Sequence, residues 1–167
     1  GNIYIGGTGK TPLAIKIKNE LENFKKTVVV RKYYKDHMDE HRLINETTNS
    51  LILNSSRSAA IQEAEKNNYD VVILDDGFQD YSIKKDLNIL CFNSNQLIGN
   101  GLLFPSGPLR EGMHSIRDAK IIIINGKINE EFEKKVFEIS ESTSIYYSKY
   151  VPLNTSQLKG KKIFAIA

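Results

Sequence analysis

The sequence predicts an α/β fold of three layers built around a mainly parallel β-sheet. Two observations predict it. Short apolar runs rich in β-branched residues recur along the chain, as expected for strands that are buried on both faces of a parallel sheet. Amphipathic helical patterns lie between several of these runs, and such alternation favours right-handed strand–helix–strand crossovers. The expected strands are 2–5, 27–30, 50–53, 71–74, 87–92, 120–124, 144–147 and 162–167, and the expected helices are 11–24, 56–67 and 129–140.

Each predicted helix has its own signals. The first places Leu13, Ile17, Leu21 and Phe24 at spacings of three and four, on one helix face. The second opens at Ser56 or Ser58, and the third at Asn129, all residue types that cap helix N-termini. The stretches 32–42 and 93–118 show no regular pattern, and long irregular loops in a compact domain usually have a function.

The composition is that of one globular domain spanning residues 1–167. Hydrophobic residues make up 40% of the chain and charged residues 26%. A net charge of +3 gives no reason to expect a nucleic-acid partner, and no obligate protein partner is evident.

Cys91 is the single cysteine, which excludes an internal disulfide, and its apolar surroundings predict a buried strand thiol. No apolar run is long enough to predict a transmembrane helix. Because the chain starts at Gly1 and ends in an apolar run, we expect it to be part of a longer protein.

A glycine-rich segment follows the first expected strand and leads directly into the first expected helix. Glycines let backbone N–H groups wrap a phosphate, and a helix N-terminus adds partial positive charge. Lys10 would reach the β- and γ-phosphates, and the Thr11 hydroxyl would ligate Mg²⁺. The segment therefore predicts a P-loop NTPase-like fold that binds ATP. The expected nucleotide-contacting residues are Tyr4, Ile5, Gly6, Gly7, Thr8, Gly9, Lys10 and Thr11.

This loop departs from the strict phosphate-loop pattern. Tyr4 stands where the first glycine is usual, and a doubled glycine at 6–7 replaces it, as in partition-type ATPases. Those ATPases carry a lysine just before the doubled glycine, whereas this chain has Ile5.

The apolar run 71–74 ends in two acids, Asp75 and Asp76, which is the expected form of a Walker B element. An acid at the carboxyl end of a strand beside the phosphate loop can hold Mg²⁺ or its water. Successive strand residues face opposite ways, so the two aspartates should have different roles, and the sequence does not say which lies nearer the metal. The alternative is a strand that simply ends in an Asp-Gly turn.

Three segments together resemble the tetraacyldisaccharide 4'-kinases of lipid A synthesis. They are GNIYIGGTGKTP at 1–12, DDGFQDYSIKKDLNI at 75–89 and GNGLLFPSGPLRE at 99–111. The resemblance implies Mg²⁺-dependent transfer of the γ-phosphoryl group of ATP to the 4'-hydroxyl of a lipid A disaccharide precursor. It also implies a peripheral location at the cytoplasmic face of the bacterial inner membrane.

The chain also departs from that family. Position 80 is Asp where the family has His, and the family's Ser-Arg-Gly-Tyr-Gly stretch appears as VRKYY at 30–34. The family's membrane-associated N-terminal helix and smaller C-terminal domain lie outside this sequence. We therefore expect the chain to be soluble and inactive by itself.

The resemblance also suggests the catalytic residues. The family's Gly-Asp-Glu-Pro motif corresponds to MDEH at 38–41, so Asp39 is the expected base, with Lys10 offsetting charge on the transferred group. Alternatively, Asp39 and Glu40 are acids favoured by a helix N-terminus. Arg110 or Arg31 would assist Lys10, and Glu111 in the long loop would add to the metal site formed by Thr11, Asp75 and Asp76. The histidines lack metal-ligand spacing and are expected to be exposed; they are His37, His41 and His114.

Three functions remain open from the sequence. The first is the lipid kinase. The second is a partition-type ATPase that switches partners with its nucleotide state, against which Ile5 speaks. The third is a module that binds ATP without turnover.

Overall fold

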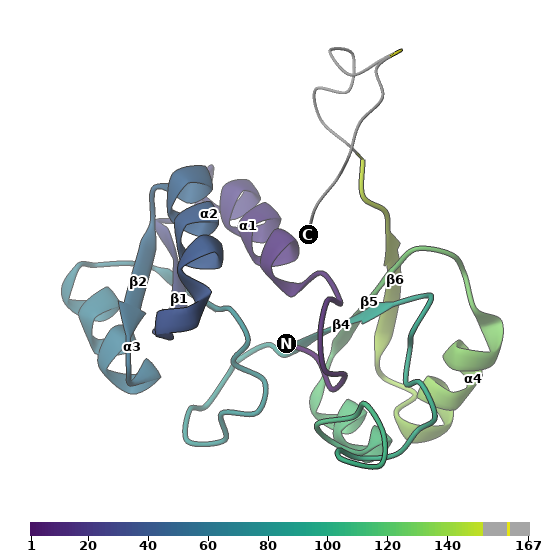
Figure 1. The fold of residues 1–167 in the computed structure, drawn as a ribbon. Helices are drawn as coiled ribbons and strands as arrows, with labels where there is room; N and C mark the ends of the chain where they lie inside the picture. Colours follow the sequence, from purple (N-terminus) through teal and green to yellow (C-terminus); the bar gives the residue numbers. More distant parts are fainter. Residues whose placement is uncertain (152–159, 161–167) are drawn as a thin grey trace.

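The computed structural model describes residues 1–151 and Gly160, and its two halves each contain a parallel sheet (Figure 1). Helices and strands alternate along most of the chain, as predicted. The elements are α1 (Lys10–Leu21), β1 (Thr27–Lys32), η1 (Lys35–His37), α2 (Met38–Thr48), β2 (Leu51–Asn54), α3 (Arg57–Lys66), β3 (Val71–Leu74), β4 (Ile89–Asn93), η2 (Met113–Asp118), β5 (Ile121–Asn125), α4 (Glu130–Ile139) and β6 (Ser144–Ser148).

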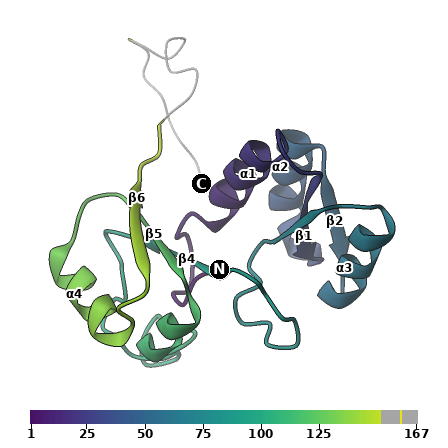
Figure 2. The same ribbon diagram turned by 180° about the vertical axis from the view of Figure 1, so that it is seen from behind.

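The first sheet has the order β2-β1-β3, with both pairs parallel. Val28 and Val30 of β1 share one face of the sheet and pack with Ala60 and Ala64 of α3. Helices α1 and α2 contact the same sheet and each other (Figures 1 and 2). Because side chains alternate along a strand, Arg31 points to the opposite face from Val30. The sheet is therefore sandwiched between helices, and a charged residue of β1 faces the phosphate-loop helix.

The second sheet has the order β4-β5-β6 and is also parallel. Its core is formed by alternate residues of β4 and β5, among them Phe92 and Ile124, against Phe132 and Val136 of α4. The rings of Phe92 and Phe132 meet edge to face with centroids 4.9 Å apart. Cys91 is buried in β4, as predicted.

The segment between the two sheets differs from the prediction. Residues 2–5 do not form a strand of the parallel sheet. Gly1 hydrogen-bonds to β4, but Tyr4 makes an antiparallel bridge to Leu109, and the Ile5 amide donates to the Pro108 carbonyl at 2.8 Å. The Asn2 side chain binds the Tyr4 and Gly6 carbonyls, which curls the backbone away from an extended course. A cleft of about 530 Å³ separates β3 from β4 and is lined by apolar residues of α1.

The expectation of irregular structure over 32–42 was wrong from Lys35 onward, where η1 and α2 lie; only the alternative for Asp39 and Glu40 placed a helix start there. The buried residues of α2 are His41, Ile44 and Thr48, of which only Ile44 is apolar, so no run of apolar residues marks its inner face. Tertiary packing stabilises it instead, because the buried Lys18 of α1 donates to the Thr48 carbonyl at 2.6 Å, and cations near helix C-termini are favourable. The strand expected at 162–167 lies outside the described residues. Among the residues that are described, no helix is long and apolar enough to cross a membrane.

Candidate nucleotide and catalytic site

The phosphate loop occupies the start of α1. Gly6 has φ of 104° and Gly9 has φ of 92°, left-handed values that favour glycine. A Cβ added at Gly6 would meet no atom within 4 Å, so glycine is favoured here by its positive φ and not by crowding. The space beside it is open to a ligand. Gly9 is the N-cap of α1, and Pro12 lies in the first turn, where its missing N–H costs no intrahelical hydrogen bond. The first N–H groups of α1 have no intrahelical partner and suit phosphate oxygens.

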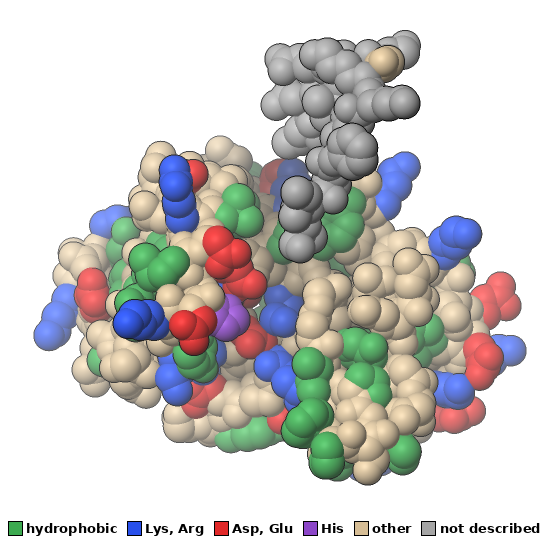
Figure 3. Space-filling view, in the orientation of Figure 1, with side chains coloured by type: hydrophobic (Ala, Val, Ile, Leu, Met, Phe, Trp, Pro, Cys, Tyr) green, Lys and Arg blue, Asp and Glu red, His purple; other side chains and the backbone are tan. Residues whose placement is uncertain are grey.

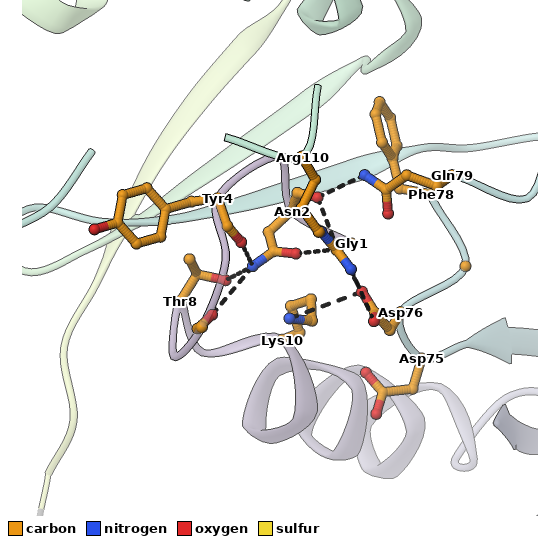
Figure 4. Close-up of polar contacts among 12 residues, drawn as sticks. Gly1, Asn2, Tyr4, Thr8, Lys10, Asp75, Asp76, Phe78, Gln79 and Arg110 are labelled. Atoms are coloured by element: carbon orange, nitrogen blue, oxygen red, sulfur yellow. Dashed lines mark hydrogen bonds and ion pairs between the residues drawn. The ribbon is translucent and has the colours of Figure 1, made fainter. Parts of the chain in front are cut away.

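Asn2 holds this loop to the rest of the site (Figure 4). Its fully buried side-chain amide donates to the Tyr4 carbonyl at 2.6 Å and to the Thr8 hydroxyl at 3.0 Å. Its backbone carbonyl accepts from Gln79 at 2.8 Å and from Arg110 at 3.0 Å. Asn2 thus joins three segments that are far apart in the sequence. No role was predicted for Asn2 from the sequence, although it is the second residue of one of the segments that resemble the kinase family.

Asp75 and Thr11 lie together, as the sequence predicted. The Thr11 hydroxyl donates to the Asp75 carboxylate at 3.1 Å, and Arg31 donates to the same oxygen at 2.5 Å. Asp75 is only 2% exposed, and its second oxygen has no hydrogen-bond partner among the described residues. A buried, unpaired carboxylate oxygen beside a phosphate-loop hydroxyl fits a hard divalent cation such as Mg²⁺.

Asp76 faces a different set of groups. Its backbone has φ of 54°, which turns it away from the course of β3. It accepts two hydrogen bonds from Arg110, at 2.8 and 3.2 Å, and its carboxylate lies 3.7 Å from Lys10 Nζ. Burial opposes its ionisation, but the Arg110 hydrogen bond and the charges of Lys10 and Arg110 outweigh that effect and lower the pKa of Asp76 to about 2. The two aspartates therefore have different environments, as expected.

Glu111 has a separate partner. It accepts a hydrogen bond from the Tyr81 hydroxyl at 2.8 Å, which together with burial raises the pKa of Tyr81 to about 12. Within residues 1–151 and 160, no group of three or more His, Cys, Asp or Glu side chains is arranged to hold a metal ion. The structure thus brings Thr11 and Asp75 together, and each of Asp76 and Glu111 is bound by other side chains.

Asp39 and Glu40 lie in the first turn of α2, the position that the helix-terminus alternative required. Glu40 forms an ion pair with Arg31, and His37 Nδ1 lies 3.7 Å from its carboxylate. The neighbouring Asp39 is exposed to solvent. Arg31 thereby connects α2 to the Asp75–Thr11 pair. Figure 3 shows acidic and basic side chains and a histidine gathered where the two halves of the molecule meet.

The prediction that all three histidines are exposed was wrong for His41, which is 3% exposed. It lies on the inner face of α2 and stacks on Tyr33, with ring centroids 5.6 Å apart. Burial lowers the pKa of His41, and the charges of Arg31 and His37 lower it further, against a smaller opposing effect of Glu40.

We expect acid to destabilise the fold through His41. The unfolded chain takes up a proton near pH 6.5, whereas the folded state resists it until a lower pH. The contribution of neutral His41 to the free energy of unfolding is therefore fully present above pH 6.5, and it is lost as the pH falls through the lowered pKa of His41. Urea unfolding between pH 7 and pH 5 should show a smaller slope of unfolding free energy for His41→Phe than for wild type. His114→Phe, at an exposed position, should keep the wild-type slope, and an unchanged slope in His41→Phe would contradict this origin.

Comparison with known proteins gives a family and a fold. The model of the family described as tetraacyldisaccharide-1-P 4'-kinase matches residues 1–167. The tetraacyldisaccharide 4'-kinase of Pelagibacter ubique is 43% identical over 162 residues, covering 94% of this chain and 51% of that protein. The enzyme of the same name from Vibrio parahaemolyticus is 29% identical, covering 99% of this chain and 55% of that protein. The chain thus spans about half the length of these curated relatives.

Solved structures of hydrogenase maturation factor HypB have a similar fold. The protein from Archaeoglobus fulgidus gives a TM-score of 0.60 at 12% identity, covering 86% of this chain and 76% of that chain. HypB from Helicobacter pylori, in complex with nickel, gives 0.64 at 11% identity, covering 88% and 76%. At such low identity these likenesses concern the fold alone. They confirm the predicted P-loop NTPase-like three-layer α/β fold.

Proposed function

Because the chain belongs to the tetraacyldisaccharide-1-P 4'-kinase family, we propose that it supplies the ATP-binding half of a kinase that phosphorylates the 4'-hydroxyl of an acylated disaccharide 1-phosphate. The observation that carries the proposal is the Thr11–Asp75 pair at the start of the phosphate-loop helix. The partition-type ATPase is set aside because the family match spans the whole chain.

The donor side of the site suits ATP. The backbone N–H groups at the start of α1 would bind the β- and γ-phosphates. Mg²⁺, held by the Thr11 hydroxyl and the Asp75 carboxylate, would neutralise part of the phosphate charge. Lys10 would leave Asp76 for the γ-phosphate, and Arg110 would keep Asp76 ionised and in place. These cations offset the negative charge that spreads over the transferred group.

The acceptor side is assigned to the first turn of α2. Asp39 would take the proton of the 4'-hydroxyl as its oxygen forms a bond to the γ-phosphorus and the bond to the β–γ bridging oxygen breaks, releasing ADP. Its exposure leaves the carboxylate accessible to an acceptor. Glu40, paired with Arg31, would fix this turn beside the metal pair. Glu111 would contribute to the metal site only after releasing Tyr81.

The proposed acceptor also suggests where the protein works. A lipid with several acyl chains resides in a membrane, so the complete protein would act as a peripheral protein at the cytoplasmic face of the bacterial inner membrane. Exposed basic residues between positions 25 and 35, among them Lys25, Lys26 and Lys35, agree with an anionic lipid surface.

The test is phosphorylation of a tetraacyldisaccharide 1-phosphate by the complete protein with Mg-ATP. We expect one phosphate to be added, at the 4'-position, and the reaction to depend on both ATP and a divalent cation. A protein that binds Mg-ATP but transfers no phosphate to this acceptor would instead be a nucleotide-binding module without turnover.

A further inference from the structure

Two adjacent tyrosines follow β1 on the acceptor side of the site. Tyr33 and Tyr34 are each 46% exposed, although large aromatic side chains usually bury most of their area. A histidine ring supports each of them. Tyr33 stacks on His41 at an interplanar angle of 27°, and Tyr34 meets His37 with centroids 5.5 Å apart. These contacts hold the two rings and leave about half of each side chain open. We call Tyr33 and Tyr34 the tyrosine ledge.

A continuous chain of contacts joins the ledge to the phosphate loop. His37, beside Tyr34, lies 3.7 Å from the Glu40 carboxylate. Glu40 pairs with Arg31, and Arg31 in turn donates to the Thr11 hydroxyl at 3.3 Å. The ledge is therefore positioned by the same elements that position the proposed metal pair and the proposed base. A molecule lying on the ledge would be next to the first turn of α2.

The charge around the ledge suits an anionic ligand in part. Lys32 Nζ lies 5.7 Å from the centre of the Tyr34 ring, and Lys35 is exposed in the following turn. Asp36 and Asp39 are exposed in the same segment, so the charge there is mixed, and Lys32 is the cation that lies over a ring of the ledge. Open aromatic rings beside a lysine match the chemistry of a phosphorylated sugar, which has an apolar C–H face and an anionic group.

We propose that the tyrosine ledge binds the acceptor by stacking on a pyranose ring, with Lys32 paired to the acceptor's phosphate; this rests on the proposed function, which supplies a disaccharide phosphate as the acceptor. Tyr33 and Tyr34 thus bind a sugar ring and take no part in the proton transfer. Their role is to present one hydroxyl of the sugar to the first turn of α2.

Steady-state kinetics of the complete protein test the proposal. The double variant Tyr33→Leu/Tyr34→Leu should raise KM for the disaccharide phosphate about tenfold, the scale of one or two aromatic contacts. Its kcat and its KM for ATP should stay within about twofold of wild type. Tyr33→Phe/Tyr34→Phe keeps both rings and should bind the acceptor nearly as wild type does. Tyr146→Leu, at a 58% exposed position on β6, is the matched control and should change nothing.

A second measurement does not depend on turnover or on the variants. An isotope-filtered NOE experiment with wild-type protein and the deacylated disaccharide phosphate should show the pyranose C–H protons in contact with the assigned ring protons of Tyr33 and Tyr34. Absence of these contacts would overturn the ledge even if the leucine variants were to fail to fold.

The kinetic measurements have their own outcomes. An unchanged acceptor KM in a folded leucine double variant, with active wild type, would overturn the ledge and leave the proposed kinase activity intact. An equal rise in the leucine and phenylalanine variants would overturn stacking in favour of hydroxyl hydrogen bonds. If wild type were to transfer no phosphate, the proposed function would fail, and the NMR contacts would still decide the ledge.

Discussion

Replacing Lys10 by alanine is expected to weaken Mg-ATP binding by about 10- to 100-fold, because a hydrogen bond to a charged group contributes about 1.5–3 kcal/mol. Lys10 is 18% exposed at its side chain and lies at the start of α1, beside the loop that would hold the phosphates. Its charge is therefore only partly screened by solvent. Turnover should fall further than affinity, by about 10²-fold or more, because the same cation would neutralise charge that develops during transfer.

Isothermal titration calorimetry with the complete protein measures the affinity, and a coupled assay measures turnover. Lys16→Ala is the matched control, since Lys16 is on the same helix, is well exposed and pairs only with Glu20 among the described residues. It should leave both quantities unchanged. The fold should survive Lys10→Ala, because Arg110 still binds the Asp76 carboxylate. An affinity for Mg-ATP equal to that of wild type would count against the phosphate loop.

The features that could be predicted from the sequence are those encoded locally. The phosphate loop needs glycines, a lysine and a threonine in consecutive positions before a helix, and all of them are visible in a window of six residues. Buried parallel strands such as β1 and β5 are continuous apolar runs, so they too could be predicted. Helix α2 was expected only as the alternative for Asp39 and Glu40, because two of its three buried residues, His41 and Thr48, are polar. The Lys18 side chain that binds the Thr48 carbonyl lies 30 residues away in the sequence.

The parts of the site that were missed depend on contacts between distant segments. Asn2 and Arg110 are 108 residues apart, and nothing near either position indicates that they meet. The sequence predicted that Thr11 lies beside an aspartate, but not that Arg31 lies there too. Arg31 of β1 belongs to the site because it forms ion pairs with Asp75 and Glu40. The different partners of Asp75 and Asp76 follow from strand alternation and from the left-handed backbone at Asp76. Strand alternation could be predicted from the sequence, but the left-handed backbone at Asp76 could not.

Asp39→Asn in the complete protein is expected to lower turnover with the lipid acceptor by about 10²-fold or more while leaving ATP affinity nearly intact. The asparagine keeps the shape and one hydrogen-bond acceptor of the aspartate but loses the charge that attracts the hydroxyl proton. Because Asp39 is exposed in the first turn of α2, its removal should cost only a few tenths of a kcal/mol in stability through the helix dipole.

Glu40→Gln gives the contrast that identifies the base. Glu40 pairs with Arg31, which also binds Asp75, so its neutralisation should lower the melting temperature more than Asp39→Asn does. Its effect on turnover should be smaller, because it would act through the position of α2 and not through the proton. Asp36→Asn, an exposed change one turn earlier, controls for charge alone and should leave both quantities unchanged. Turnover and melting temperature measured on the same preparations separate these outcomes. If Asp39→Asn retains full turnover and Glu40→Gln abolishes it without loss of stability, Glu40 is the base, and Asp39 acts only as an acid at a helix N-terminus.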